Sequence, residues 1–389
     1  MPKKFQVAMA AAMLMVLTGC ETLLPKGADP TPPPETTTDP TPQGPIDDVV
    51  GTDNQRHKVA LLLPLSGSNS GIGTSIANAT TQALLDTEAQ NIRITRYDTA
   101  KGATAAAQQA IADGNKLILG PLLSDNVRAA ANVATPANVP IISYSNDSSV
   151  ASNMVFIMGF VPDQSIERVV RHARAQGMNR FAGLIPNGVY GQRASSALLQ
   201  AVRNAGGSVV RMETYNRSRS SLESAISGLA EVSDYDALLI ADNGQTAIRA
   251  VPQVRNSGAT RAKILGTELW NTDTTLSGAP SMRGAWFASV SDELYRQYAT
   301  KYRQRFGSQP FRLSSLGYDS VLLTYRVARE WPMGSLFPVD RLRESGGFVG
   351  LDGAFRFGPT GIAERALEVQ EIRTSGNAII SAAPRSFED

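Results

Sequence analysis

The sequence predicts an α/β protein with two similar lobes, each a parallel sheet flanked by helices. Apolar runs of strand length alternate with amphipathic helical patterns from residue 57 onward, as in repeated strand–helix units. The alternation restarts near residue 180, so the chain carries two consecutive series of such units. About 330 residues follow the N-terminal region, which is enough for two lobes with cores of their own.

The first series opens with a continuous apolar run, Val59 to Leu63, that ends at Pro64. A run without polar alternation is typical of a parallel strand that is buried on both faces. The other elements expected in this series are helices at 74–86 and 103–112 and strands at 92–98, 116–120, 139–144 and 155–160.

The second series has the same pattern. Its strands are expected at 180–185, 208–213, 237–240, 263–265 and 285–288, and its helices at 164–176, 191–205, 221–230, 245–256, 291–306 and 313–330. A turn at 358–361 between apolar runs at 355–357 and 366–373 indicates a closing hairpin.

We expect the first lobe to hold about 57–161 and 289–332, and the second about 162–288 and 333–375, with a tail at 376–389. Parallel sheets bind ligands at the carboxyl ends of their strands, so a ligand-sized cleft is expected between the lobes.

Cys20 is the only cysteine in the chain. Before it lie a basic start with Lys3 and Lys4 and an apolar run of about 11 residues, which is the layout of a signal peptide and is too short to span a bilayer. The run Leu17-Thr18-Gly19-Cys20 resembles a bacterial lipobox, which implies a signal peptide at 1–19 and a lipid on Cys20. An ordinary signal peptide cleaved near Gly19, or a cysteine buried in a folded segment, is the alternative.

The segment 20–56 is rich in proline and threonine, with eight prolines between 21 and 56. Such a composition cannot bury a core, so we expect an extended or disordered tether between the lipid and the lobes. An ordered arm packed on the body is the alternative.

Composition excludes several classes of function. Without Lys3 and Lys4 the chain has 35 basic and 35 acidic residues, so it has no electrostatic footprint for nucleic acid. His57 and His172 are both expected to be solvated, and an exported chain with no free thiol argues against a transition-metal site. Nucleotide-binding loops and a G-x-S-x-G elbow are absent, and no carboxylates are marked as an acid/base pair, so we expect neither a cofactor nor an enzyme.

Five motifs resemble type I periplasmic binding proteins of the leucine-binding kind and occur in that family's order and spacing. They lie at 57–67, 119–124, 139–143, 189–191 and 350–357, and the resemblance covers about 57–373. Within that superfamily the chain is similar to the LpoA-like penicillin-binding protein activators. The segments 61–67, 155–160 and 383–388 are typical of the alphaproteobacterial branch of these activators.

The resemblance implies candidate ligand contacts in the cleft. Ser124 matches the serine that binds a ligand carboxylate, Tyr190 the aromatic of a Tyr-Gly motif, and Glu268 the acid that meets a ligand ammonium. A further carboxylate contact, counted from Ile142-Ser143, falls on Asn146-Asp147. Asp147 would repel a ligand carboxylate, so these positions only half match an amino-acid site, and each could instead have a surface or hinge role.

The resemblance implies a non-enzymatic periplasmic lipoprotein that binds and activates a class A penicillin-binding protein in peptidoglycan synthesis at the cell envelope. A solute-binding lipoprotein that delivers an amino acid or similar small molecule to an ABC transporter is the alternative. Glu21 is not the aspartate typical of inner-membrane retention, which favours an outer-membrane anchor. Sequence does not identify the partner synthase, any cleft ligand or the oligomeric state.

The lipid anchor is directly testable. Cys20→Ser removes the acceptor thiol, so we expect the variant to stay unprocessed or to leave the membrane fraction. Membrane fractionation and mass spectrometry of the N-terminus measure this. A serine variant that is cleaved normally and still sediments with membranes would contradict the prediction.

Overall fold

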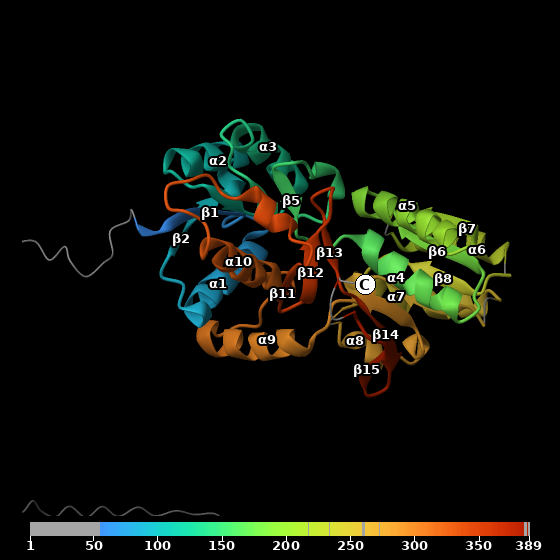
Figure 1. Cartoon of the computed structure of the whole chain (residues 1–389). Helices are drawn as coiled ribbons and strands as arrows, with labels where there is room; N and C mark the ends of the chain where they lie inside the picture. The colour runs from blue at the N-terminus through green and yellow to red at the C-terminus, as the bar shows by residue number, and fades with distance from the viewer. Residues whose placement is uncertain are drawn as a thin grey trace, which may run out of the picture. The chain divides into compact units, whose positions relative to one another are not determined.

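The computed structural model describes residues 55–384 and 387, except residues 217, 233, 259, 260 and 272. Cys20, the signal peptide and the linker up to residue 54 lie outside the described residues. The described part belongs to one compact unit with two lobes (Figure 1). No helix among the described residues is long and apolar enough to span a membrane.

The first lobe is built on a parallel sheet with the strand order β2-β1-β3-β4-β5. Its strands are β1 (His57–Leu63), β2 (Ile92–Asp98), β3 (Leu117–Leu119), β4 (Ile141–Ser143) and β5 (Val155–Ile157).

The second lobe repeats this order as β7-β6-β8-β9-β10, also parallel. Its strands are β6 (Arg180–Pro186), β7 (Ser208–Tyr215), β8 (Ala237–Ile240), β9 (Lys263–Gly266) and β10 (Trp286–Ser289). Because the two strand orders match, the predicted fold of two similar parallel lobes is confirmed.

Helices cover both sheets (Figure 1). They are α1 (Ser70–Thr87), α2 (Ala103–Ala112), α3 (Ser124–Ala134), α4 (Pro162–Ala175), α5 (Val189–Asn204), α6 (Arg219–Ala230), α7 (Gly244–Asn256), α8 (Thr275–Gly278), α9 (Glu293–Phe306) and α10 (Ser314–Ala328). The sequence analysis did not predict α3. Its buried face consists of Val127, Ala130 and Ala134, which give a weak apolar signal.

Strand β1 shows why the lobes form two-sided cores. Leu61 and Leu63 pack in one apolar cluster with residues of α1 and α10, whereas Ala60 and Leu62 pack in another with residues of α2 and α3. Successive side chains point to opposite faces of a sheet, so a strand covered on both faces must be apolar throughout. The continuous apolar run therefore follows from helices on both sides.

The two lobes also share a close approach between their first strand and first helix. A Cβ on Gly73 of α1 would overlap the carbonyl oxygen of Pro64, and a Cβ on Gly191 of α5 would overlap that of Pro186. Only glycine lets each helix start this close to the end of its strand. This accounts for the glycine of the Tyr190-Gly191 motif.

The chain crosses between the lobes three times: between β5 and α4, between β10 and α9, and again before β14 (Glu368–Arg373). This differs from the expected division of the chain at 333–375. Phe337, Phe348, Phe355 and Ala363 pack in the core of the first lobe, and the one strand of 333–375 that joins the second sheet is β14.

The end of the chain also differs from the expected hairpin. Strand β12 (Gly353–Phe357) pairs with β13 (Ala363–Arg365), not with 366–373, and with β11 (Phe348–Gly350) forms a small antiparallel sheet. Strand β14 pairs with β10 and with β15 (Gly376–Ser381), so part of the expected tail extends the second sheet.

The expectation that both histidines are solvated was wrong for His57. The residue is 6% exposed, and its ring stacks on that of Trp331 at 4.0 Å between centroids. His172 is half-buried and contacts Trp286 edge to face. Both therefore serve packing, since aromatic rings stabilise such pairs.

A buried carboxyl group holds the turn between β11 and β12 on α10. Asp319 Oδ1 accepts a hydrogen bond from the backbone N–H of Leu351 at 2.7 Å, and its Oδ2 accepts one from Asp352 at 3.4 Å. Burial, reinforced by the charge of Asp352, raises the pKa of Asp319 to about 7. The motif at 350–357 is thus a structural anchor of the first lobe.

This anchor predicts a pH dependence of stability. An unfolded aspartate has a pKa near 3.9, so between about pH 4 and 7 the folded state alone holds the proton, and the free energy of unfolding falls as pH rises. Asp319→Asn mimics the protonated acid. Between pH 5 and 8 the free energy of unfolding of this variant should therefore fall by about 1–3 kcal/mol less than that of the wild type. Urea unfolding at both pH values measures this, and equal losses would contradict it.

Candidate functional site

The candidate residues lie where the fold predicts a site, at the carboxyl ends of parallel strands. Ser124 begins α3 after β3, and Ser143 ends β4, with Asn146 and Asp147 in the loop that follows. In the second lobe, Tyr190 lies in α5 after β6, and Glu268 follows β9. The residues thus come from both lobes.

Asp147 does not present a free charge. Its side chain is 5% exposed, and Arg128 of α3 donates to Oδ2 at 2.9 Å. Arg193 of α5, in the other lobe, donates to Oδ1 at 3.0 Å, and the hydroxyl and backbone N–H of Ser149 complete the set at 2.6 and 3.0 Å. One carboxylate is therefore shared by guanidinium groups of both lobes, and we call Asp147, Arg128 and Arg193 the interlobe clamp.

The ionised form of Asp147 is favoured in the clamp. Burial alone raises the pKa of this carboxyl, but the hydrogen bonds from Ser149 and Arg128 and the charge of Arg193 lower it below its usual value. Charge-assisted hydrogen bonds of this kind are stronger than neutral ones. The position that the sequence analysis judged hostile to a ligand carboxylate is therefore filled by a carboxylate of the protein.

The first-lobe candidates do not join the second-lobe site. Among the described residues, no hydrogen bond links Glu268 to Ser124, Ser143 or Asn146. Ser143 is fully buried, donates to the carbonyl of Pro121 at 3.1 Å and accepts from the backbone of Ser145 at 3.0 Å. Asn146 is exposed and Ser124 is half-buried. Ser143 thus holds its own loop in place.

Glu268 and Tyr190 are brought together. Tyr190 donates to Glu268 Oε1 at 3.0 Å, and Ser165 of α4 donates to Oε2 at 2.5 Å. The Tyr190 hydroxyl also lies 2.9 Å from Thr267 Oγ1. Burial raises the pKa of Glu268, although the bonds from Ser165 and Tyr190 oppose the shift. Both partners of Glu268 belong to the second lobe, so the acid expected to meet a ligand ammonium is satisfied within its own lobe.

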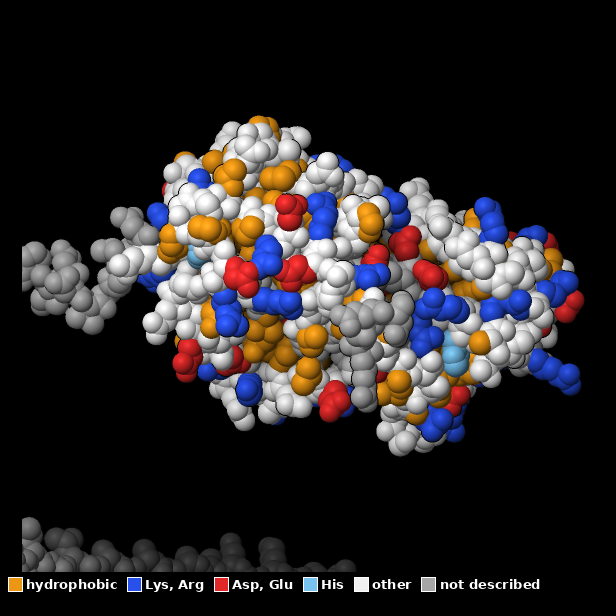
Figure 2. All heavy atoms as spheres, viewed as in Figure 1, with side chains coloured by type: hydrophobic (Ala, Val, Ile, Leu, Met, Phe, Trp, Pro, Cys, Tyr) orange, Lys and Arg blue, Asp and Glu red, His pale blue; other side chains and the backbone are white. Residues whose placement is uncertain are grey.

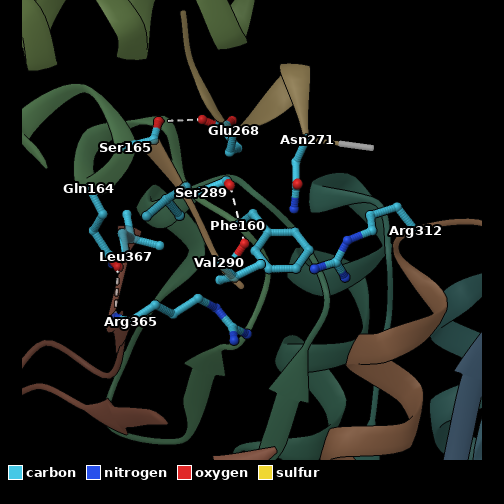
Figure 3. Close-up of a pocket in the computed structure, with 11 residues that line it drawn as sticks. Phe160, Gln164, Ser165, Glu268, Asn271, Ser289, Val290, Arg312, Arg365 and Leu367 are labelled. Atoms are coloured by element: carbon cyan, nitrogen blue, oxygen red, sulfur yellow. Dashed lines mark hydrogen bonds between the residues drawn. The ribbon is translucent and has the colours of Figure 1, made fainter. Parts of the chain in front are cut away.

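A small cavity lies where the three crossings meet (Figure 3). It is lined by Phe160 at the first crossing, Val290 at the second and Arg365 at the third, with Glu268 at one end. Its volume is about 40 Å³. Small-molecule sites in proteins usually measure some 300–1,000 Å³, so this cavity has room for water but not for an amino acid.

Two arginines, Arg365 buried and Arg312 partly buried, stiffen this crossing region, and the sequence analysis did not single out either. Arg312 pairs with Asp352 at 2.8 Å and stacks on Tyr295 at 4.2 Å. Arg365 donates to the carbonyl of Met158 at 2.5 Å and stacks on Phe160 at 4.8 Å. In the sequence, the one signal for this region was the motif that contains Asp352, because nothing in the local sequence marks an arginine as buried.

On the face seen in Figure 2, the charged side chains form no large patch of one sign. Figure 2 shows acidic and basic side chains interspersed over the visible face. Among the described residues, no three histidine, cysteine, aspartate or glutamate side chains converge as a metal site requires.

Comparison with known proteins confirms the resemblance that the motifs indicated. The model of the family described as "Periplasmic binding protein" matches residues 57–377. The chain is 24% identical over 327 residues to the penicillin-binding protein activator LpoA of Mannheimia succiniciproducens, covering 81% of this chain and 54% of that protein. It spans about half the length, or less, of the relatives it matches in this way.

Solved structures share the fold. A branched-chain amino acid ABC transporter periplasmic ligand-binding protein from Burkholderia xenovorans matches with a TM-score of 0.70 at 16% identity, covering 86% of this chain and 97% of that one. Full-length LpoA from Haemophilus influenzae matches with a TM-score of 0.65 at 19% identity, covering 84% of this chain and 59% of that one.

The interlobe clamp predicts a defined effect of one substitution. Arg193→Gln removes the only clamp residue of the second lobe and leaves Asp147 paired with Arg128, so the lobes should separate more easily, by about 1–2 kcal/mol. Small-angle scattering should show a larger radius of gyration. Arg171→Gln, which changes an exposed arginine of α4 whose ion pair is with Glu167 of the same helix, is the control. Indistinguishable scattering from both variants would refute the clamp.

Proposed function

Because the chain belongs to the periplasmic binding protein family, we propose that it is a non-enzymatic regulator that binds and activates a class A penicillin-binding protein. Membership of that family places its work in the periplasm. The observation that carries the proposal is that charged groups at the cleft are paired within the protein. Asp147 is held by Arg128 and Arg193, and Glu268 by Ser165 and Tyr190.

The relatives support this function over the others that the fold allows. Several proteins similar in sequence are named penicillin-binding protein activator LpoA, including that of Escherichia coli, which is 28% identical over 116 residues. These relatives are considerably longer than this chain, so their activity is carried over as a proposal. A regulator that acts by contact needs a stable surface and not a ligand pocket, which suits a closed pair of lobes.

The N-terminal features suit the same role. A lipid on Cys20 and a tether over 20–56 would hold the body at a membrane, with the outer membrane favoured, while letting it reach a partner. An activator anchored in one membrane must reach across the distance to its partner synthase. Both features are proposals from the sequence.

The second candidate is a solute-binding lipoprotein of an ABC transporter. It is favoured by the fold, since the Burkholderia xenovorans ligand-binding protein is covered almost entirely by this chain. At 16% identity that likeness concerns the fold alone. The occupied positions of Asp147 and Glu268 weigh against an amino acid as the ligand.

The activator proposal is tested by glycan polymerisation and crosslinking with the organism's own class A synthases, each tried with and without the purified mature chain. We expect stimulation by the wild type. Ser124→Ala and Glu268→Gln should retain it within about twofold, because contact and not a cleft ligand is responsible.

Each outcome bears on the proposal. No stimulation of any class A synthase by the wild type would refute it. Stimulation that is lost in the two cleft variants, with unchanged thermal melting, would instead indicate a regulator that depends on a bound ligand.

A further inference from the structure

A large groove lies outside the cleft. Its volume is about 640 Å³, against about 40 Å³ for the cavity at the crossings. One wall is α9 of the first lobe and the other is a face of the β14–β15 hairpin of the second lobe, both at the lower edge of the molecule in Figure 1. The groove therefore needs both lobes to be held in place.

Carboxylates dominate the groove. Asp273, Asp292, Glu293 and Glu368 line it, against a single cation, Arg296. Asp292 is paired with Arg312 behind it, at 3.4 Å. Among the described residues no ion pair holds the other three carboxylates, so the groove presents a net negative charge.

The surroundings of Glu368 indicate that the groove would accept a further positive charge. This side chain belongs to a residue that is only 5% exposed, and its one hydrogen-bond donor among the described residues is Gln370, at 2.7 Å. Burial raises the pKa of Glu368, and the charges of Asp292 and Glu293 add to the shift, whereas the bond from Gln370 and the charge of Arg296 oppose it. A cation in the groove would offset both the desolvation and the repulsion.

The walls favour a cation that is carried on an apolar stem. Tyr295, Ala299 and Ile379 line the groove beside the carboxylates, and Ile379 is 59% exposed. Lysine and arginine side chains pack their methylene groups on such surfaces while the charged end reaches a carboxylate. A free metal ion fits less well, because no three ligands converge in the described part of the chain.

We propose that this groove docks a lysine- or arginine-bearing segment of a protein partner. The charge complementarity and the mixed apolar and acidic walls are what select it. That the segment belongs to the synthase rests on the proposed function, whereas the preference for a basic segment does not.

Two measurements separate these claims. The first is fluorescence anisotropy of a labelled octapeptide of alternating lysine and alanine, with a glutamate–alanine octapeptide as the matched probe. The mature chain should bind only the basic peptide, and more weakly as salt rises. Glu293→Gln/Glu368→Gln should weaken binding by about tenfold. Glu167→Gln/Glu223→Gln, which removes two carboxylates of the second lobe that do not line the groove, should not.

The second measurement is stimulation of the synthase by the same variants. Glu293→Gln alone, at an exposed position of α9, guards against loss of folding in the double variant and should weaken peptide binding in the same direction. Peptide binding that depends on the groove, with no synthase stimulated by the wild type, would support the groove and refute the activator. Stimulation that is intact in both groove variants, with peptide binding unchanged by them or absent, would refute the groove and leave the activator standing.

Discussion

The carboxylate of Asp147 is the interaction on which the arrangement of the lobes depends. It joins α3 of one lobe to α5 of the other through Arg128 and Arg193. In proteins that close around a ligand, closure is driven by the ligand's differential contacts with the two lobes. Here a side chain supplies those contacts, so the closed state is built into the sequence. The groove between α9 and the β14–β15 hairpin then keeps a fixed shape, as a docking surface requires.

The crossing region complements the clamp in holding the two lobes together. Arg312 and Arg365 lie there among Asp352, Asp319 and aromatic rings, with Arg365 buried and a cavity of only about 40 Å³. Buried charges are costly unless they are paired, and breaking one partner leaves the other uncompensated. Three crossing segments held by such ion pairs resist rotation of one lobe against the other. Clamp and crossings together favour one relative orientation of the lobes.

Much of the fold could be predicted because its causes are local. The run from Val59 to Leu63 is apolar because helices cover both faces of β1, and the repeated strand–helix pattern fixes the two parallel sheets. Helix α3 was not predicted, because its buried face consists mainly of small residues and gives a weak apolar pattern. The segment from Phe337 to Ala363 was expected in the wrong lobe, since its aromatic residues are equally apolar for either core. The site was harder still. Sequence identified Asp147 as hostile to a carboxylate, but its partner Arg193 lies 46 residues away and meets it only when the lobes close.

The central claim is that the protein's own groups occupy the cleft in place of an amino acid. Calorimetric titration of the mature chain with leucine, isoleucine and valine tests this most directly. A second carboxylate beside Asp147 would be repelled, and the ammonium would have to displace Ser165 and Tyr190 from Glu268. The account predicts no measurable heat of binding for any of the three. A dissociation constant at or below the micromolar range would contradict it and favour a transporter's binding protein.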